Sequence, residues 1–410
     1  MKQFHESIAK YIGGTLLIIG TSIGGGMLAL PIVLSKVGFA NTFVALIFCW
    51  FIMTLGALFI LEVCAQLPTG TNLISMSRYT LGPIGAGIAW ISYLFLLYSL
   101  LSGYIAGGSD IIYTVSQSFS FPLSDPFQAC IFTLLCSVIV YRGIETVDYV
   151  NRGLMFGKLS IYLILLVLIS PFIQSHQLSV GSIHAIPPTL TTLISAYGFA
   201  TIVPSLRDYF HNDLVGLRKM ILWGSCIPLI CYIFWNAVIM GVIPAHGAFG
   251  LVSLMHDPHA TSTLGESLSH VLHTPWIIKL FNFFTSICIL TAFLAVSTGL
   301  FDFLADGLSL KKQGSQGFAV FLLTFAPPLA IVLLKPDLYL LAFRFAGVAC
   351  IILLLLLPAL MVWRGRKTHK VWTSSHIPGG YFTVYFLIAS SLFMLYIAIK
   401  YEIFLKMGWL

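Results

Sequence analysis

Long apolar runs separated by short polar connections dominate the chain. Each run can form a helix of about 20 residues, the length that crosses the hydrocarbon core of a bilayer, and none alternates as a barrel strand does. The pattern predicts eleven transmembrane helices, at residues 8–34, 40–66, 84–117, 126–141, 152–173, 189–210, 218–243, 275–307, 317–334, 338–363 and 380–402. A further short helix is expected in the long connection before the eighth span, from Thr263 to Leu272.

The first span contains a break in its helix-forming sequence. Three consecutive glycines occupy positions 24–26, and Pro31 follows them. Each glycine lowers helix propensity by about 1 kcal/mol relative to alanine. Broken backbone within the hydrocarbon is tolerated only where it is buried in protein or lines a water-filled cavity. We therefore predict a binding site at this break.

The sixth span repeats this feature. Gly198 is followed six residues later by Pro204, as Gly24 is followed seven residues later by Pro31. The two spans stand at matching positions of two five-span halves, and an odd number of spans makes such halves inverted. Paired interruptions of this kind mark the midplane binding site of many transporters, although glycine is also common where membrane helices pack. The halves and the last span divide the chain into residues 1–173, 174–364 and 365–410.

The two breaks offer complementary backbone groups. Free N–H groups near Gly25 and Gly26 begin a half-helix, and the N-terminal end of a helix attracts a carboxylate. The carbonyls that end the preceding half-helix and the segment 190–197 suit an ammonium group. A site with both is suited to a zwitterion such as an amino acid. The aromatic residues that are candidates for an apolar side-chain pocket are Tyr98, Tyr104, Tyr197 and Phe199.

Composition agrees with a membrane protein. The 410 residues are 58% hydrophobic and 9% charged, whereas a soluble domain has about 25% charged residues. All eight cysteines fall within apolar runs and no CxxC occurs, so we expect neither a disulfide framework nor a metal site. The first apolar run is too long for the core of a signal peptide, and we expect it to remain as an anchor.

The distribution of Lys and Arg predicts the orientation. With the N-terminus in the cytoplasm, fifteen of the 21 basic residues lie on the cytoplasmic side, five lie outside, and Arg344 lies within a span. Cytoplasmic loops of membrane proteins carry such an excess. The formal net charge of +7 therefore reflects topology and anionic lipid, not nucleic acid. An odd number of spans places the C-terminus in the periplasm.

Ionisable residues inside spans are costly and are usually paired. Lys158 and Glu62 have similar predicted depths, so we expect them to meet, although a lysine at this depth can also reach the interface with its amine. Asp110 and Arg344 both lie near the outer surface, where they are candidates for an outer gate or for a static ion pair. Two further carboxylates, Asp302 and Asp306, are expected to meet neighbouring Lys or Arg residues.

Five histidines gather in the outer connection between the seventh and eighth spans: His246, His256, His259, His270 and His273. They raise the alternatives of a metal site or an acid sensor. The spacing of imidazoles alone is a weak signal, because no cysteine accompanies them. We expect no metal here.

Three segments resemble the hydroxy/aromatic amino acid permease family, and most closely its tyrosine-transporting members. They are GTSIGGGMLALP (Gly20–Pro31), YGFATIVPSL (Tyr197–Leu206) and TGLFDFLADGL (Thr298–Leu308). The similarity extends through nearly the whole chain. It implies the amino acid–polyamine–cation superfamily and an all-α integral membrane protein with the LeuT-type fold, in which five plus five inverted spans are followed by one more. It also implies proton-driven uptake across the bacterial inner membrane.

The resemblance assigns residues to the site. Its motifs imply backbone ligands of the substrate at Ser22, Ile23, Gly24, Gly25, Gly26 and Met27, and at Ala196, Tyr197, Gly198, Phe199 and Ala200. Arg344 departs from the pattern, which has a small or neutral residue there. Sodium-coupled relatives of this fold hold an ion between the first, fifth and eighth spans. The ammonium group of Lys158 is expected to replace that ion and to contact the carbonyls of residues 14–19, with Glu62 nearby.

These features favour a symporter that imports an aromatic amino acid with protons, with tyrosine as the leading substrate. A sodium-coupled amino acid transporter and a tryptophan or broad aromatic permease are the alternatives. A membrane-embedded enzyme would need a catalytic constellation. HExxH does not occur, and GxSxG occurs only as Gly20–Gly24, inside the broken first span. A channel would need a repeated filter loop or a charged ring. The expected partners are the substrate, protons and membrane lipid, without a cofactor.

Overall fold

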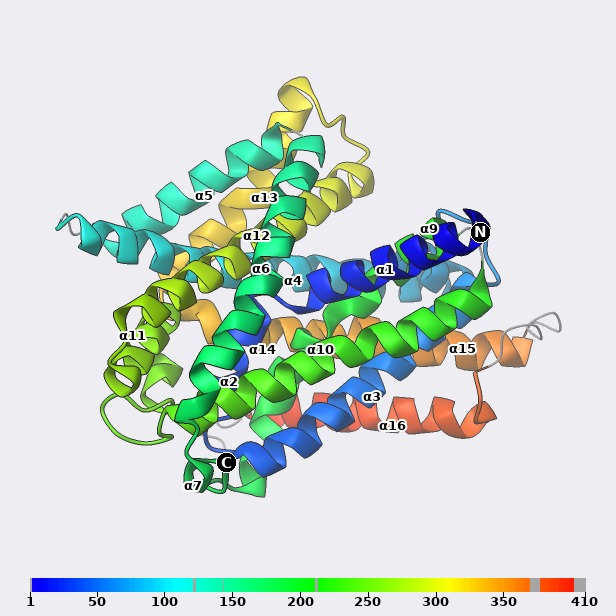
Figure 1. The fold of residues 1–410 in the computed structure, drawn as a ribbon. Coiled ribbons are helices and arrows are strands. Elements are labelled where there is room, and N and C mark those ends of the chain that lie inside the picture. Colours follow the sequence, from blue (N-terminus) through cyan, green and yellow to red (C-terminus); the bar gives the residue numbers. More distant parts are fainter. Residues whose placement is uncertain (1, 121–122, 143, 211–212, 369–376, 402–410) are drawn as a thin grey trace.

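A computed structural model of the chain describes residues 2–120, 123–142, 144–210, 213–368 and 377–401, and their regular structure is helical throughout (Figure 1). The long helices are α3 (Phe39–Cys64), α4 (Leu73–Ser118), α6 (Ile144–Ile169), α10 (Leu214–Val242), α12 (Pro275–Gly307), α13 (Gly314–Leu334) and α16 (Gly380–Ile399). Within α4 the chain is kinked at Gly82, whose backbone is not helical. Another long segment joins α14 (Leu338–Cys350) to α15 (Leu357–Thr368) through the π-helical turn η6 (Ile351–Leu356). This architecture is that of an integral membrane protein.

Ten segments of the described residues are long and apolar enough to cross a membrane when the bent pair at the first span counts as one. An eleventh apolar helix, α5 (Asp125–Tyr141), occupies the position predicted for the fourth span but has only 17 residues. The existence and order of the predicted elements are therefore confirmed, while the total of eleven crossings stays a prediction. The last predicted span ended at residue 402, which lies outside the described residues.

Both predicted breaks are present. The first span consists of α1 (Lys2–Ser22) and α2 (Gly25–Val33), and the two halves meet at a bend of 50°. In the sixth span, α8 (Leu190–Ala196) ends just before Gly198, the 3₁₀ segment η4 (Gly198–Ile202) follows, and α9 (Val203–Tyr209) completes the crossing. Pro204 lies in the first turn of α9, where a proline costs no internal hydrogen bond.

The two broken spans pack against each other in antiparallel directions. The second half of the first span, α2, packs on α8, the first half of the sixth span. Its other half, α1, packs on η4 and α9. The breaks therefore lie side by side: a Cβ added to Gly26 would be 3.6 Å from the Cα atom of Ala196. Inverted halves require this antiparallel arrangement.

Glycine permits two close helix contacts that support the breaks. Gly347 of α14 packs against the backbone of Thr191 in α8, where a Cβ would overlap the Thr191 carbonyl group. Gly56 of α3 packs in the same way against the Leu354 carbonyl of η6. Small residues allow membrane helices to approach at backbone distance. These contacts hold α14 directly beside α8.

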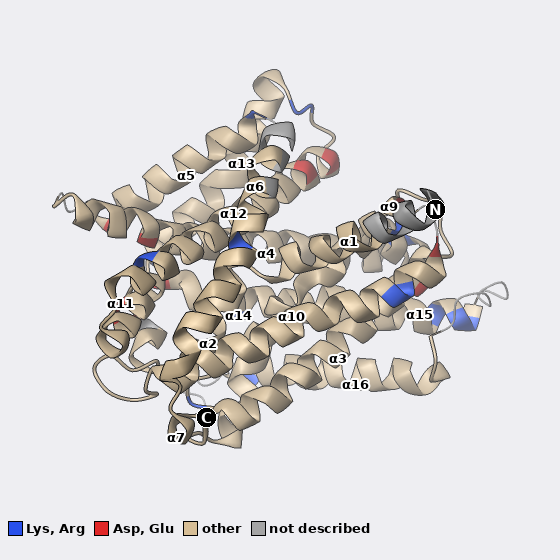
Figure 2. Ribbon diagram, viewed as in Figure 1, with Lys and Arg blue, Asp and Glu red and all other residues tan. Residues whose placement is uncertain are grey.

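Charged residues gather toward the ends of the helices, and most of the helical length between them is uncharged (Figure 2). The N-terminal end of α1, α9 and the end of α15 lie together at one end of the bundle, called the α9 end below (Figure 1). The opposite end carries α7 (Ser175–Leu178) and α11 (Ala260–Leu272), and is called the α11 end. The loop helix expected at Thr263–Leu272 is thus confirmed. Lys370 and Lys406, which entered the charge count, lie outside the described residues.

Candidate functional site

The carbonyl groups at the two breaks are bridged by a tyrosine of α10. The hydroxyl of Tyr232 lies 2.6 Å from the Ser22 carbonyl oxygen and 2.7 Å from that of Ala196. A phenol carries one proton, so Tyr232 can donate to only one of these carbonyls at a time. The carbonyls that we predicted to suit an ammonium group therefore already contact a hydroxyl, which can satisfy one of them at a time. The tyrosine joins the breaks across the bundle.

Lys158 of α6 reaches the first break and is completely buried. Its amine donates to the Ile23 carbonyl at 2.6 Å and contacts the hydroxyl of Thr291, on α12, at 3.4 Å. We predicted a contact with the carbonyls of residues 14–19. The structure instead has the contact at Ile23, closer to the glycines. The amine ties three segments of the protein together, because α6, the first span and α12 each supply one group.

Aromatic side chains form a wall against the glycines of α2. A Cβ added to Gly25 would lie 2.8 Å from Cε1 of Tyr104 and 3.3 Å from Cζ of Phe343. The rings of Tyr104 and Phe343 meet edge to face, with centroids 5.7 Å apart. The hydroxyl of Tyr339 donates to the Gly25 carbonyl at 2.7 Å. Only glycine leaves room for this aromatic wall, and it brings the α2 backbone directly against the rings.

The two breaks also contain buried hydroxyl groups that have hydrogen-bonding capacity left. The side-chain oxygens of Ser22 and Tyr197 are buried and have no hydrogen-bond partner among the described residues. Met27, Phe199 and Ala200 are completely buried around them. Buried polar atoms are normally satisfied. The break therefore offers unused polar atoms as well as an apolar surround.

The N–H groups of Gly25 and Gly26 are in the first turn of α2, where a helix has no internal acceptor for them. All nine residues of α2 are buried, so protein covers this half of the span on every side. Gly198 at the other break is only half-buried, and a Cβ there would meet no atom of the described residues within 4 Å. Room for a further side chain thus exists at the second break.

Glu62 and Lys158 do not form the predicted pair. Glu62 of α3 instead accepts two hydrogen bonds from Arg366 of α15, at 2.7 and 2.6 Å, and one from the backbone N–H of Ile377 at 3.1 Å. The guanidinium also donates to the Gly380 carbonyl at 2.8 Å, at the start of α16. Glu62 therefore belongs to a clamp at the α9 end, and its role is to hold α15 and α16 on α3.

Replacing Glu62 with glutamine is expected to lower the free energy of unfolding by about 3–5 kcal/mol, because it leaves Arg366 buried without its charge partner. Only 1% of the Glu62 side chain and 5% of the Arg366 side chain are exposed. The measurement is thermal or denaturant unfolding in detergent. Lys312→Gln is the control, since the Lys312–Asp302 pair at 2.7 Å is exposed and is worth about 0–1 kcal/mol. Equal losses in the two variants would contradict this assignment.

The control pair also confirms an expectation. Lys312 lies 2.7 Å from Asp302 and 3.9 Å from Asp306, so both carboxylates meet a neighbouring basic residue as predicted.

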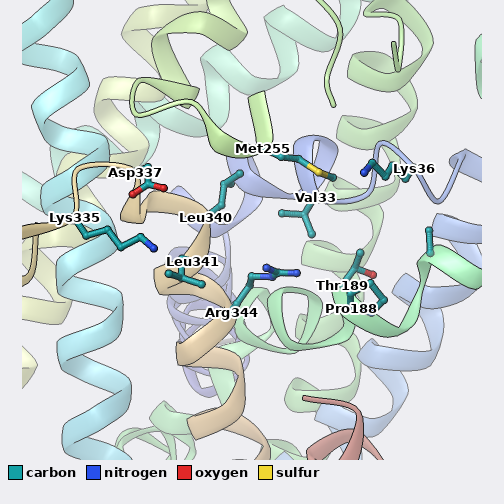
Figure 3. A pocket seen from close by; sticks show the side chains of 11 residues that line it. Val33, Lys36, Pro188, Thr189, Met255, Lys335, Asp337, Leu340, Leu341 and Arg344 are labelled. Carbon is teal, nitrogen blue, oxygen red and sulfur yellow. The ribbon is translucent and has the colours of Figure 1, made fainter. Parts of the chain in front are cut away.

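Asp110 and Arg344 do not form the predicted gate pair. The carboxylate of Asp110, on α4, lies 2.9 Å from Nδ1 of His259 and accepts hydrogen bonds from the hydroxyl and N–H of Thr261. His259 stacks on Tyr113, with ring centroids 4.2 Å apart. These contacts dock α11 on α4. Arg344 lies on α14, which continues as a regular helix through that position, and lines a cavity at the α11 end (Figure 3).

The His259 contact predicts a pH-dependent docking of α11. The hydrogen bond to Asp110 raises the pKa of His259 above its ordinary value of 6.5, and the charges of Asp110, Asp125 and Asp257 act in the same direction against burial. A raised pKa adds stability that is fully present below about pH 6.5 and is lost as the pH rises through the raised value. The melting temperature of the wild type relative to His259→Gln should therefore be higher at about pH 6 than at about pH 9.

His270→Gln is the matched control for this prediction. His270 lies on the same helix and stacks on Phe249, with centroids 3.6 Å apart. Its substitution should leave the pH dependence of the melting temperature unchanged. The docking interpretation is wrong if both variants follow the wild-type pH profile.

Sequence reasoning missed three residues that contact the breaks, Tyr232, Tyr339 and Phe343. It also missed Thr291, which contacts the Lys158 amine. Aromatic residues make up 14% of the chain, so nothing in the sequence distinguishes the three aromatic ones. The described residues contain no group of three or more His, Cys, Asp or Glu side chains that could hold a metal ion.

Comparison with known proteins identifies the family. The family model described as the tryptophan/tyrosine permease family matches residues 7–398. The chain belongs to this family. The family and the relatives below are named as permeases and transport proteins and not as enzymes, so this permease is a membrane transporter by family.

Three relatives cover nearly the whole permease. The tyrosine-specific transport system 1 of Haemophilus influenzae is 29% identical over 372 residues, which are 88% of this chain and 91% of that protein. The tryptophan-specific transport protein of Pseudomonas aeruginosa is 30% identical over 364 residues, 87% of this chain and 86% of its own. Glutamine transporter 2 of Aliivibrio fischeri is 29% identical over 375 residues, 90% of this chain and 93% of its own. Relatives that are named for three different substrates are therefore about equally identical to this chain.

Proposed function

We propose that this permease is a secondary transporter that imports an aromatic amino acid by alternating access, with tyrosine as the leading substrate. The observation that carries the proposal is the antiparallel meeting of two broken spans, where Gly26 lies against Ala196. Paired breaks of this kind form transporter binding sites at the membrane midplane. The tyrosine- and tryptophan-specific names of two relatives support an aromatic substrate.

The site groups suit a zwitterion. The N–H groups of Gly25 and Gly26, in the first turn of α2, would bind the carboxylate, aided by the positive end of this helix. The carbonyls of Ser22 and Ala196, which share the single Tyr232 proton, would accept hydrogen bonds from the ammonium group. An ammonium group has three donors, so it can satisfy carbonyls that one hydroxyl cannot satisfy together.

The aromatic wall suits a flat side chain. Tyr104 and Phe343 stand against the α2 glycines, and Phe199 is buried at the second break. Aromatic rings favour edge-to-face and offset contacts with one another. The hydroxyl groups of Ser22 and Tyr197, which have no partner in the described part of the chain, would supply hydrogen-bonding capacity for a polar substrate group. A site that binds a substrate hydroxyl rejects the analogue without it, which favours tyrosine over phenylalanine.

The fold that we propose has two inverted five-span repeats, residues 1–173 and 174–364, and an eleventh span in residues 365–410. This is the LeuT-type arrangement, and α5 would be its fourth crossing. The excess of Lys and Arg at one side supports an orientation with the N-terminus in the cytoplasm and the C-terminus in the periplasm. The membrane that we propose is the bacterial inner membrane. The α11 end then faces outward.

We propose protons as the coupling ion. The Lys158 amine joins the Ile23 carbonyl to the Thr291 hydroxyl between α1, α6 and α12. A cation at this position would close the inner side of the protein, as sodium does in relatives of the fold. Loss of the proton would remove the cation and release the contact. Glu62 takes no part in this step, because Arg366 holds it.

Uptake by the purified permease in proteoliposomes tests the function. Labelled tyrosine and tryptophan are supplied separately, with a proton gradient or a sodium gradient imposed alone. The proposal predicts accumulation of tyrosine on the proton gradient. Accumulation that needs sodium overturns the coupling, preference for tryptophan overturns the substrate, and uptake of glutamine alone overturns the aromatic class.

A further inference from the structure

The helix α4 is too long to be a single straight membrane crossing. Its 46 residues would extend about 69 Å at 1.5 Å per residue, whereas the hydrocarbon core is about 30 Å thick. The helix is kinked at Gly82, whose φ of 81° lies in the left-handed region that favours glycine, and Pro83 follows. The kink divides α4 into an entry arm, residues 73–81, and a longer crossing arm, residues 83–118.

The entry arm lies at the α9 end of the bundle. Just before it, the Gly70 N–H donates to the carboxylate of Asp208, on α9, at 3.2 Å. On the arm itself, the hydroxyl of Ser77 contacts the sulfur of Met361, on α15, at 3.5 Å. Ser77 is buried, whereas its neighbour Arg78 is exposed. The arm therefore packs one side on protein and presents another side outward.

The two arms of α4 line a groove of about 710 Å³. Residues that are three or four positions apart lie on one face of a helix. The entry arm contributes Ile74 and Arg78, which are four positions apart. One face of the crossing arm supplies the rest of the lining, namely Pro83, Ala86, Gly87, Trp90 and Ile91. A Cβ added to Gly87 would meet no atom of the described residues within 4 Å, so there is open space at this position.

Arg78 supplies the charge of this groove, and the other six lining residues are Gly, Ala, Pro, Ile or Trp. Among the residues that the structure describes, Arg78 forms no ion pair. Asp302 and Asp306 on α12 do not line the groove, and both meet Lys312. Trp90 is half-buried, and tryptophan is enriched where hydrocarbon meets the headgroups of a membrane. The groove thus combines one cation with an apolar wall.

We propose that this groove binds one anionic phospholipid, with its phosphate group on the Arg78 guanidinium and an acyl chain along the face from Gly87 to Ile91. A guanidinium presents a planar fork of N–H donors that matches two phosphate oxygens. The apolar wall suits an acyl chain attached to that phosphate and gives a free phosphate ion no further contact. The lipid is not the transported amino acid, so this site is separate from the proposed function. A lipid held by both arms would brace the kink at Gly82.

Titration of the purified permease with phosphatidylglycerol in detergent, followed by native mass spectrometry, tests the site. Arg78→Gln should weaken binding about tenfold, because the charge-assisted hydrogen bonds to the phosphate are lost. Gly87→Leu should also weaken binding, since the new side chain occupies the groove and its Cβ meets no described atom within 4 Å. Phosphatidylcholine, whose headgroup has no net charge, should bind the wild type more weakly than phosphatidylglycerol does.

Arg142→Gln and Gly153→Leu are the matched controls and should keep the wild-type affinity. Arg142 is an exposed cation at the end of α5, and Gly153 is an exposed glycine of α6 whose added Cβ would meet no described atom within 4 Å. Melting temperatures of all variants establish that they are folded.

Four results would overturn the site. Wild-type affinity in Arg78→Gln, or an equal loss in Arg142→Gln, would show that phosphatidylglycerol is attracted by surface charge alone. Wild-type affinity in folded Gly87→Leu would show that no acyl chain occupies the groove. Equal affinity for phosphatidylcholine would show that the anionic headgroup is not recognised. Displacement of the lipid by inorganic phosphate would indicate an ion site instead of a lipid site.

Discussion

Gly26→Val is expected to abolish binding of the amino acid while the protein still folds. The α2 backbone must approach the substrate carboxylate, and the valine side chain would point toward Ala196 across the gap between the breaks. A Cβ at Gly26 meets its nearest atoms at 3.6 Å, which is ordinary contact, so Gly26→Ala should be tolerated by the fold. Loss of charge-assisted hydrogen bonds worth about 1.5–3 kcal/mol predicts a weakening of roughly 10- to 100-fold even for Gly26→Ala. Equilibrium binding to purified protein measures both.

The matched control is Gly299→Ala on α12, where a Cβ meets no atom of the described part of the chain within 4 Å. Its affinity should equal that of the wild type. Gly25→Val differs from both, because its Cβ would be 2.8 Å from Tyr104 and must displace that ring. A well-folded Gly26→Val protein with wild-type affinity would show that the break is not part of the binding site.

Lys158→Met should keep equilibrium binding and lose accumulation driven by a pH gradient. For one proton per substrate, a difference of one pH unit can support about tenfold accumulation, since that difference is worth about 1.4 kcal/mol. The wild type should approach this ratio, whereas Lys158→Met should bring internal and external substrate to equal concentrations. Methionine preserves most of the side-chain length but cannot donate to the Ile23 carbonyl, which loses its 2.6 Å partner. Uptake into proteoliposomes gives both ratios.

Two variants control this experiment. Lys219→Met removes an exposed lysine of α10 and should keep the wild-type accumulation. Thr291→Val removes only the longer contact, at 3.4 Å, and should keep coupling while changing its rate. If Lys158→Met still concentrates substrate on a proton gradient, the coupling group is elsewhere, and the pair of Asp110 and His259 is the next candidate.

The helices and the breaks were predictable because their signals are local. A long enough run of apolar residues predicts a membrane helix without knowledge of its neighbours. The glycines at 24–26 and Gly198 weaken the helix whichever helices surround it. The antiparallel contact of α2 with α8 agrees with the direction expected from an odd number of spans.

The partners of the charged residues were not predictable in the same way. Each residue along a helix turns the side chain by about 100°, so similar depth does not establish that two side chains face each other. Glu62 faces Arg366 on α15, a helix that lies about three hundred positions away in the chain. Asp110 met a histidine from the connection that we had given no role. Rotation of each helix about its axis is set by packing, which a single sequence does not record.

The single proton of Tyr232 has a consequence for leakage through the proposed transporter. With no substrate bound, the Tyr232 hydroxyl can satisfy only one of the two buried carbonyls at Ser22 and Ala196 at a time. A buried polar group without a partner costs about 1–3 kcal/mol, so an empty closed intermediate that keeps this arrangement would be penalised each time it forms. A bound ammonium group would remove the penalty. The closed intermediate would then form readily when loaded and less readily when empty, which would reduce futile cycling and limit the escape of accumulated substrate.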